Sequence, residues 1–178
     1  MGTDPAFATL ARTLGEEMAR RGIGLVYGGG RLGLMGVVAD AVMDNGGEAY
    51  GVIPQALVDL EVAHTGLTEL HLVANMHERK AMMTELTDAF VAIPGGVGTL
   101  DELFEAWSWN ALGYHAKPFA LLNVNHFWDG LIAFMDHASA SGFLSPARRA
   151  QLIVADGIGE AIDRLDAAIG ATSAKMVW

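Results

Sequence analysis

The middle of the chain carries the stretch Phe90-Val91-Ala92-Ile93-Pro94-Gly95-Gly96-Val97-Gly98-Thr99-Leu100-Asp101-Glu102. Its apolar beginning predicts a buried strand, its glycines predict a turn, and its acidic end predicts the first turn of a helix. Backbone N–H groups at a helix start bind anions, and glycines let the backbone close on phosphate oxygens because no side chain intervenes. We therefore expect a phosphate-bearing ligand at Gly95, Gly96 and Gly98, with the Thr99 hydroxyl beside them.

The acid at the end of this stretch has two interpretations. Thr99 and Glu102 have the spacing of a capping box, in which Glu102 would only reach back to the Thr99 N–H group. Spacing alone favours that structural role over a chemical one. The glycines are not followed by Lys-Ser or Lys-Thr, so this is not a Walker A loop, and hydrolysis of a nucleoside triphosphate is disfavoured.

The rest of the chain alternates between strand-type and helix-type patterns. Short apolar strands separated by helix-length segments predict a parallel sheet covered on both faces, with right-handed crossovers. The expected class is therefore α/β, a Rossmann-like doubly wound parallel sheet in a single domain of residues 1–178, with a tail at 170–178. Helices are expected at 5–21, 34–44, 76–87, 99–112, 128–141 and 157–168, and strands at 24–27, 49–53, 70–73, 89–93, 119–122 and 152–154.

A second glycine-rich turn, residues 28–33, satisfies the dinucleotide pattern G-x-G-x-x-G after a strand and before a helix. That pattern also requires an acid at the end of the next strand, but here the strand ends Gly51-Val52-Ile53-Pro54. A plain tight turn or a contact to a mononucleotide is favoured over a dinucleotide site.

The segment Met76-His77-Glu78-Arg79-Lys80 places two cations on the same helical stripe as Met76 and Met83. Cations along an apolar stripe need a partner, which could be Glu102, a ligand phosphate, or both. The alternative is a solvated pair of cations whose alkyl stems cover the methionines.

Composition excludes several classes of function. The net charge is −10 and the chain has no cysteine, which argues against nucleic acid or an anionic membrane as partner and rules out a thiolate nucleophile. No apolar run is long enough for a membrane span, so we expect a cytoplasmic location. The six histidines do not have the spacing of metal ligands, which predicts no metal site. The chain also lacks the G-x-S-x-G motif of many serine hydrolases, which argues against that class of enzyme.

The two charged and glycine-rich stretches together resemble the signatures of the LOG ("Lonely Guy") proteins. These are cytokinin riboside 5′-monophosphate phosphoribohydrolases, long mislabelled as lysine decarboxylases. Further matches are Leu25-Val26-Tyr27-Gly28-Gly29-Gly30, Gly33-Leu34-Met35-Gly36, Gly51-Val52-Ile53-Pro54, Ser108-Trp109 and Lys117-Pro118. The resemblance implies a homodimer that hydrolyses the N-glycosidic bond of an adenine-type nucleoside 5′-monophosphate, without metal or cofactor.

The resemblance also implies roles for individual residues. Arg79 and Glu102 match the catalytic pair, with Glu102 stabilising positive charge on the ribose and Arg79 keeping Glu102 ionised and positioned. The implied substrate and phosphate contacts are Gly29, Glu61, Met76, Lys80, Gly95, Gly96, Gly98, Thr99 and Ser108, the last at a position where the family usually has threonine.

One departure from the family lies at the start of the chain. Members usually begin with a strand that ends in a Cys-Gly-Ser-type turn, whereas this chain starts Met1-Gly2-Thr3-Asp4-Pro5. We expect that first strand to be absent from this sequence, either because the start codon was assigned too late or because the protein lacks the strand. Two other classes of function stay open: a nucleotide or molybdenum-cofactor carrier with a similar glycine motif, and, more weakly, a dinucleotide oxidoreductase.

Overall fold

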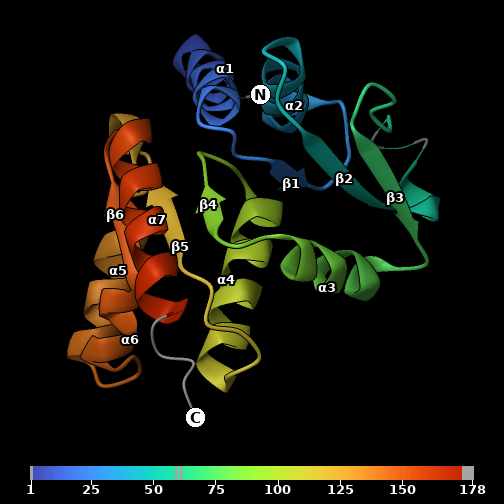
Figure 1. Cartoon of the computed structure of the whole chain (residues 1–178). Helices are drawn as coiled ribbons and strands as arrows, with labels where there is room; N and C mark the ends of the chain where they lie inside the picture. The colour runs from blue at the N-terminus through green and yellow to red at the C-terminus, as the bar shows by residue number, and fades with distance from the viewer. Residues whose placement is uncertain (1, 59, 61, 174–178) are drawn as a thin grey trace. The chain divides into compact units, whose positions relative to one another are not determined.

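The computed structural model describes residues 2–58, 60 and 62–173. The chain divides into two compact units, Met1–Thr87 and Asp88–Trp178, called here the N-terminal and C-terminal units. Within each unit, helices and strands alternate along the chain and the strands form a parallel sheet (Figure 1). The predicted α/β class with parallel sheets is therefore confirmed, and the assignment of all residues to one domain stays a prediction.

The N-terminal unit contains one three-stranded sheet in the order β1-β2-β3. Leu25 pairs with Ala49 and Tyr50 with Glu69, which sets the register of both parallel pairs. Helices α2 and α3 lie on opposite sides of this sheet (Figure 1). The elements are α1 (Pro5–Arg20), β1 (Leu25–Tyr27), α2 (Gly33–Asp44), β2 (Ala49–Pro54), the 3-10 turn η1 (Gln55–Leu57), β3 (Glu69–Val73) and α3 (Met76–Leu86).

Helix α1 starts and packs as its sequence predicts. Asp4 caps it by accepting a bond from the Ala6 N–H group, and Pro5 occupies the first helical position. Its buried face lies against α2. The two helices come close because Gly15 has no side chain: a Cβ there would lie 2.6 Å from the Val38 carbonyl oxygen.

The C-terminal unit contains a second parallel sheet in the order β4-β5-β6. Phe119 at its centre pairs with Phe90 on one side and Leu152 on the other. Phe119 also packs on Trp107 from α4, with ring centroids 5.4 Å apart. The elements are β4 (Phe90–Ala92), α4 (Val97–Leu112), β5 (Phe119–Leu122), the 3-10 turn η2 (Val124–His126), α5 (Asp129–Ala140), α6 (Pro146–Gln151), β6 (Leu152–Ala155) and α7 (Ile158–Ser173).

The largest differences from the expected elements concern three helices. Helix α4 begins at Val97 rather than Thr99, because a glycine can end the preceding turn without a side-chain cap. The short helix α6 was not predicted, although Ser145 caps it and Pro146 opens it. Helix α7 continues to Ser173, past the expected end at residue 168, and residues 174–178 lie outside the described part of the chain.

Candidate functional site

The glycine stretch of the C-terminal unit lies where β4 passes into α4. Gly96 is the N-cap of α4 and has an extended backbone, and the Leu100 N–H group donates to the Gly96 carbonyl oxygen over 3.1 Å at this end of the helix. The N–H groups of the preceding helical residues have no partner inside an α-helix and point away from its start. A Cβ at Gly96 or Gly98 would meet no described atom within 4 Å. The start of α4 can therefore admit an anion close to the backbone.

Gly95 is a glycine for a different reason. A Cβ at this position would lie 2.1 Å from the Thr99 hydroxyl oxygen. The absence of a side chain thus lets the Thr99 side chain fold back over the turn that precedes the helix. The expected role of Gly95 and Thr99 in binding a phosphate stays a prediction.

The capping-box interpretation of Glu102 is wrong. Because α4 begins at Val97, Thr99 is its third residue and not its N-cap. Glu102 therefore lies one turn further into the helix, on the same side as Thr99 and half-buried. A carboxylate in this place is not required to start the helix.

A capping box does exist at the start of α3 in the N-terminal unit. The Asn75 side chain accepts a bond from the Glu78 N–H group, 2.9 Å, and the Glu78 carboxylate accepts bonds from the Ala74 N–H group, 2.9 Å, and the Asn75 side-chain amide, 3.0 Å. Both residues of the box are occupied with each other and with the backbone. This arrangement fixes the first turn of α3, and Arg79 is the next residue of the helix after Glu78.

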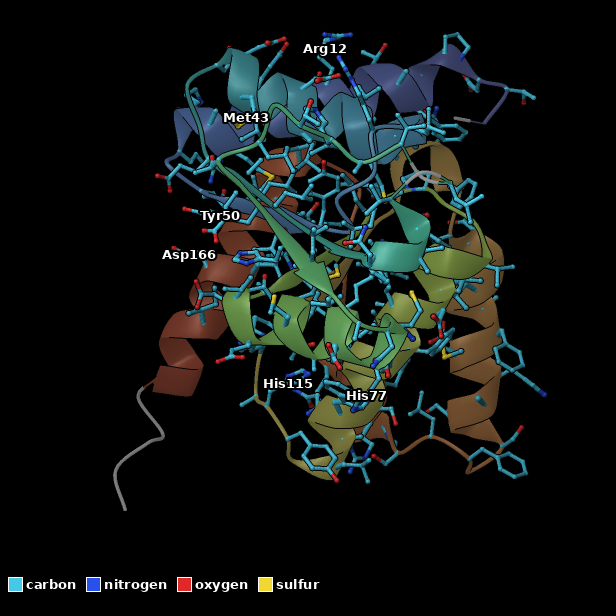
Figure 2. The ribbon with its side chains drawn as sticks, turned by 90° about the vertical axis from the view of Figure 1, so that its right-hand side faces the viewer. Arg12, Met43, Tyr50, His77, His115 and Asp166 are labelled. Carbon is cyan, nitrogen blue, oxygen red and sulfur yellow. The ribbon has the colours of Figure 1, made fainter. Side chains whose placement is uncertain are left out.

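Arg79 is buried, with only 4% of its surface exposed. Its Nη2 donates to the carbonyl oxygen of Gly28 over 3.0 Å, and its Nη1 lies 3.7 Å from the Met76 sulfur. The interpretation of Arg79 as one of a solvated pair of cations is therefore wrong. His77 lies two residues earlier in the same helix turn (Figure 2).

Gly29 is explained by backbone packing in the same unit. Its φ of +76° lies in the left-handed region, and a Cβ there would lie 3.0 Å from the Leu70 side chain. The Gly29 carbonyl accepts a bond from the His64 N–H group, 2.9 Å, and the Arg31 N–H group bonds the Val62 carbonyl, 2.9 Å. The glycine turn after β1 is thus held by the segment before β3.

The remaining site residues of the sequence prediction are spread over both units. Met76 is 41% exposed and Lys80 is half-buried, both on α3 beside Arg79. Ser108 is exposed, six residues beyond Glu102 on α4. Glu61 lies outside the described residues. The structure therefore gathers Gly29, Met76, Arg79 and Lys80 in the N-terminal unit, and Gly95, Gly96, Gly98, Thr99 and Glu102 at the start of α4.

Sequence reasoning missed the role of His64 and Asp40. The His64 ring is buried, and its Nδ1 accepts a bond from the Gly66 N–H group, 3.1 Å. Its Nε2 must then carry the proton and donates to the Asp40 carboxylate, 2.9 Å. The pair ties the segment before β3 to α2. Asp40 and His64 are 24 residues apart, so no local pattern could indicate it.

The described residues form neither a metal site nor a membrane-spanning helix. Across the ranges 2–58, 60 and 62–173, no group of three or more His, Asp and Glu side chains is arranged to hold a metal ion. None of the helices described above combines the length and apolar character needed to cross a membrane.

Comparisons with known proteins agree on one family. Residues 35–165 match the family model described as "Possible lysine decarboxylase". The chain is 49% identical to the cytokinin riboside 5′-monophosphate phosphoribohydrolase of Rhodococcoides fascians, over 90% of this chain and 82% of that protein. It is 43% identical to the enzyme LOG of Oryza sativa subsp. japonica, over 99% of this chain and 73% of that protein.

Solved structures show the same fold at low identity. The molybdenum cofactor carrier protein of Chlamydomonas reinhardtii superposes with a TM-score of 0.69 at 20% identity, over 94% of this chain and 91% of that one. The molybdenum cofactor binding protein of Rippkaea orientalis gives 0.69 at 21% identity, over 93% and 90%. This likeness concerns the Rossmann-type fold alone.

Proposed function

Because the chain belongs to the family described as "Possible lysine decarboxylase", and is close in sequence to its phosphoribohydrolases, we propose that it is a cytokinin riboside 5′-monophosphate phosphoribohydrolase. The reaction breaks the bond between the ribose anomeric carbon and the base nitrogen of an N6-substituted adenosine 5′-monophosphate. The oxygen of a water molecule bonds to that carbon, and a proton goes to the base. The products are the free base and ribose 5-phosphate.

The observation that carries the proposal is the start of α4. It opens on a glycine turn with room beside Gly96 and Gly98, and it carries Glu102 on the same side as Thr99 without using it as a cap. The positive end of the helix binds the 5′-phosphate through backbone N–H groups and the Thr99 hydroxyl. Binding energy gained at the phosphate is then available for the reaction at the sugar.

Glu102 is the residue that we assign to the sugar. Cleavage of an N-glycosidic bond develops positive charge on the ribose ring, and a fixed carboxylate nearby lowers the energy of that transition state. The same carboxylate orients the attacking water. A half-buried position favours both roles, because partial exclusion of water strengthens the electrostatic interaction.

Arg79 supplies the planar guanidinium group of the proposed catalytic pair. Its guanidinium is buried and hydrogen-bonded to the backbone, so it is held in one orientation. In the proposed reaction its charge assists the departing base, in the role that the family resemblance implies for the catalytic pair Arg79 and Glu102. Gly29, Met76, Lys80, Ser108 and Glu61 are proposed contacts to the substrate.

The proposal is tested by incubating the protein with AMP and with an N6-substituted AMP, and separating base, nucleoside and nucleotide by chromatography. We expect free base and ribose 5-phosphate in equal amounts, and a kcat/KM for adenosine lower by about 100-fold or more, because adenosine lacks the anchoring phosphate. Equal turnover of adenosine would contradict the proposed phosphate site. Binding of AMP without base release would favour a carrier.

The homodimer and the cytoplasmic location implied by the resemblance are also proposals. The lack of cysteine fits a reducing compartment. Light scattering during gel filtration measures the mass of the assembly, and a monomer mass of 18.8 kDa would overturn the dimer.

A further inference from the structure

We infer that Gly28 is a positioning residue for Arg79. Its carbonyl oxygen and the space left by its missing side chain together form what we call the Arg79 seat, and the inference rests on the proposed function, in which Arg79 is catalytic. For the glycine turn that begins at this position, the sequence pattern favoured a plain tight turn or a contact to a mononucleotide. The structure assigns Gly28 to the arginine instead.

The first step of the argument is steric. A Cβ built on Gly28 would lie 1.8 Å from Arg79 Nη2 and 2.9 Å from Cζ, whereas ordinary contacts begin at 3.4 Å. The φ of Gly28 is not in the left-handed region that requires glycine, unlike that of Gly29. The backbone would accept another residue at position 28, so the need for glycine comes from the guanidinium.

The second step concerns the hydrogen bond. Arg79 Nη2 donates to the Gly28 carbonyl at 3.0 Å, which makes the same residue both the acceptor and the surface on which the guanidinium lies. A buried guanidinium needs such acceptors because a charge that is removed from water without hydrogen-bond partners destabilises the fold. A displacement of the Arg79 side chain away from Gly28 would therefore also weaken the hydrogen bond between Arg79 Nη2 and the Gly28 carbonyl oxygen.

The third step concerns what holds the seat itself in place. Gly28 follows Tyr27, the last residue of β1, which pairs with Gly51 in β2. On the other side, the capping box of Asn75 and Glu78 fixes the turn of α3 that carries Arg79. The guanidinium is thus located by a sheet edge and a capped helix, and the small gap between them accommodates no methyl group.

The chemical consequence is a fixed direction for the charge. A catalytic group displaced by about 1 Å can lose roughly a hundredfold in rate. Moving Nη2 from 1.8 Å to ordinary contact with a new methyl group requires a shift larger than that. Gly28 therefore controls the rate by fixing the Arg79 guanidinium, without itself touching the substrate.

The test combines Gly28→Ala with the control Gly24→Ala. Gly24 precedes the same strand, and a Cβ there would make an ordinary contact of 3.5 Å with the Tyr50 ring. We expect Gly28→Ala to lower kcat for AMP by about 100-fold with little change in KM, and Gly24→Ala to leave both near the parent values. Parent kcat in Gly28→Ala would overturn the inference.

A double-mutant cycle on stability tests the seat without relying on turnover. Gly28→Ala is expected to lower Tm by about 4 °C or more in the parent, and by far less in the Arg79→Met background, where the methionine lacks the clashing Nη2. Equal losses of Tm in both backgrounds would overturn the inference that Gly28 positions Arg79, even if the protein hydrolyses AMP. If the parent releases no base but the effects of Gly28→Ala and Arg79→Met on Tm are coupled, the proposed function is refuted. The contact between Gly28 and Arg79 is then still supported.

Discussion

Tyr27 places a hydroxyl group inside the N-terminal unit, immediately before the glycine turn. The side chain is buried, and among the described residues its hydroxyl has no hydrogen-bond partner. Burial raises the pKa of Tyr27 well above its ordinary value, and the negative charge of Asp40 raises it further. The hydroxyl is thus a neutral group that lost its water contacts on folding.

Replacing Tyr27 with phenylalanine is therefore expected to stabilise the protein. Removal of a buried unpaired hydroxyl should raise the free energy of unfolding by up to about 1 kcal/mol, measured by urea denaturation. Tyr50→Phe is the control: its hydroxyl donates to Glu48 over 3.1 Å at the surface (Figure 2), and we expect a change within about 0.5 kcal/mol. A loss of more than about 1 kcal/mol in Tyr27→Phe would show that the hydroxyl has a partner.

The C-terminal end of α1 carries an ion-pair group whose effect depends on pH. Glu17 accepts bonds from Arg20 and Arg21, and these bonds lower the pKa of Glu17 from 4.5 to about 2. A carboxylate with a lowered folded-state pKa contributes stability above the unfolded value, and the contribution is lost as the pH falls from 4.5 toward 2.

We expect a small Tm advantage of the parent over Glu17→Gln at pH 6. This advantage should shrink by pH 3 and also in high salt, because the group lies at the surface and is screened. Calorimetry at the two pH values measures it. A difference that does not change with pH would mean that the lowered pKa does not contribute to folding.

The start of α4 makes a separate prediction for the phosphate loop. Gly98 and Gly130 are each the second residue of a helix, in α4 and α5, and neither has a described atom within 4 Å of a built Cβ. Alanine at either position should therefore leave the free energy of unfolding equal or slightly higher.

Only Gly98→Ala should weaken AMP binding. Its methyl group would stand where the phosphate approaches the backbone, and we expect Kd to rise by about tenfold or more, equivalent to about 1.4 kcal/mol. Titration calorimetry measures the affinity, and Gly130→Ala should match the parent. Unchanged affinity in Gly98→Ala would exclude this turn as the phosphate site.

For the whole molecule, the sequence predicted the class of fold and most elements because their signals are local. The apolar run Phe119–Leu122 indicates a buried strand, and Asn75 before Met76 indicates a helix cap. The start of α4 was misplaced because Gly96 gives no side-chain capping signal, while Thr99 gives a false one. That same error made Glu102 resemble a capping residue.

The residues of the candidate site were predicted from the resemblance of their motifs to a family. The long-range contacts that hold these residues in place were not predicted. The Arg79 side chain meets Gly28, 51 residues away in the sequence, and the His64–Asp40 pair joins two other distant segments. Such contacts depend on how strands and helices are arranged in space, which no local pattern contains. The roles of Arg79 and Glu102 follow from the proposed reaction.

The most direct test of that reaction is the rate of adenine release from saturating AMP by Glu102→Gln, beside the parent and Asp101→Asn. Asp101 is the exposed acid next to Glu102 on the same helix, so its variant controls for the loss of a negative charge near the start of α4. We predict that Glu102→Gln lowers kcat by about 100-fold or more, while Asp101→Asn stays near the parent rate. Adenine release by Glu102→Gln at the parent rate would contradict the assignment of Glu102 as the catalytic carboxylate.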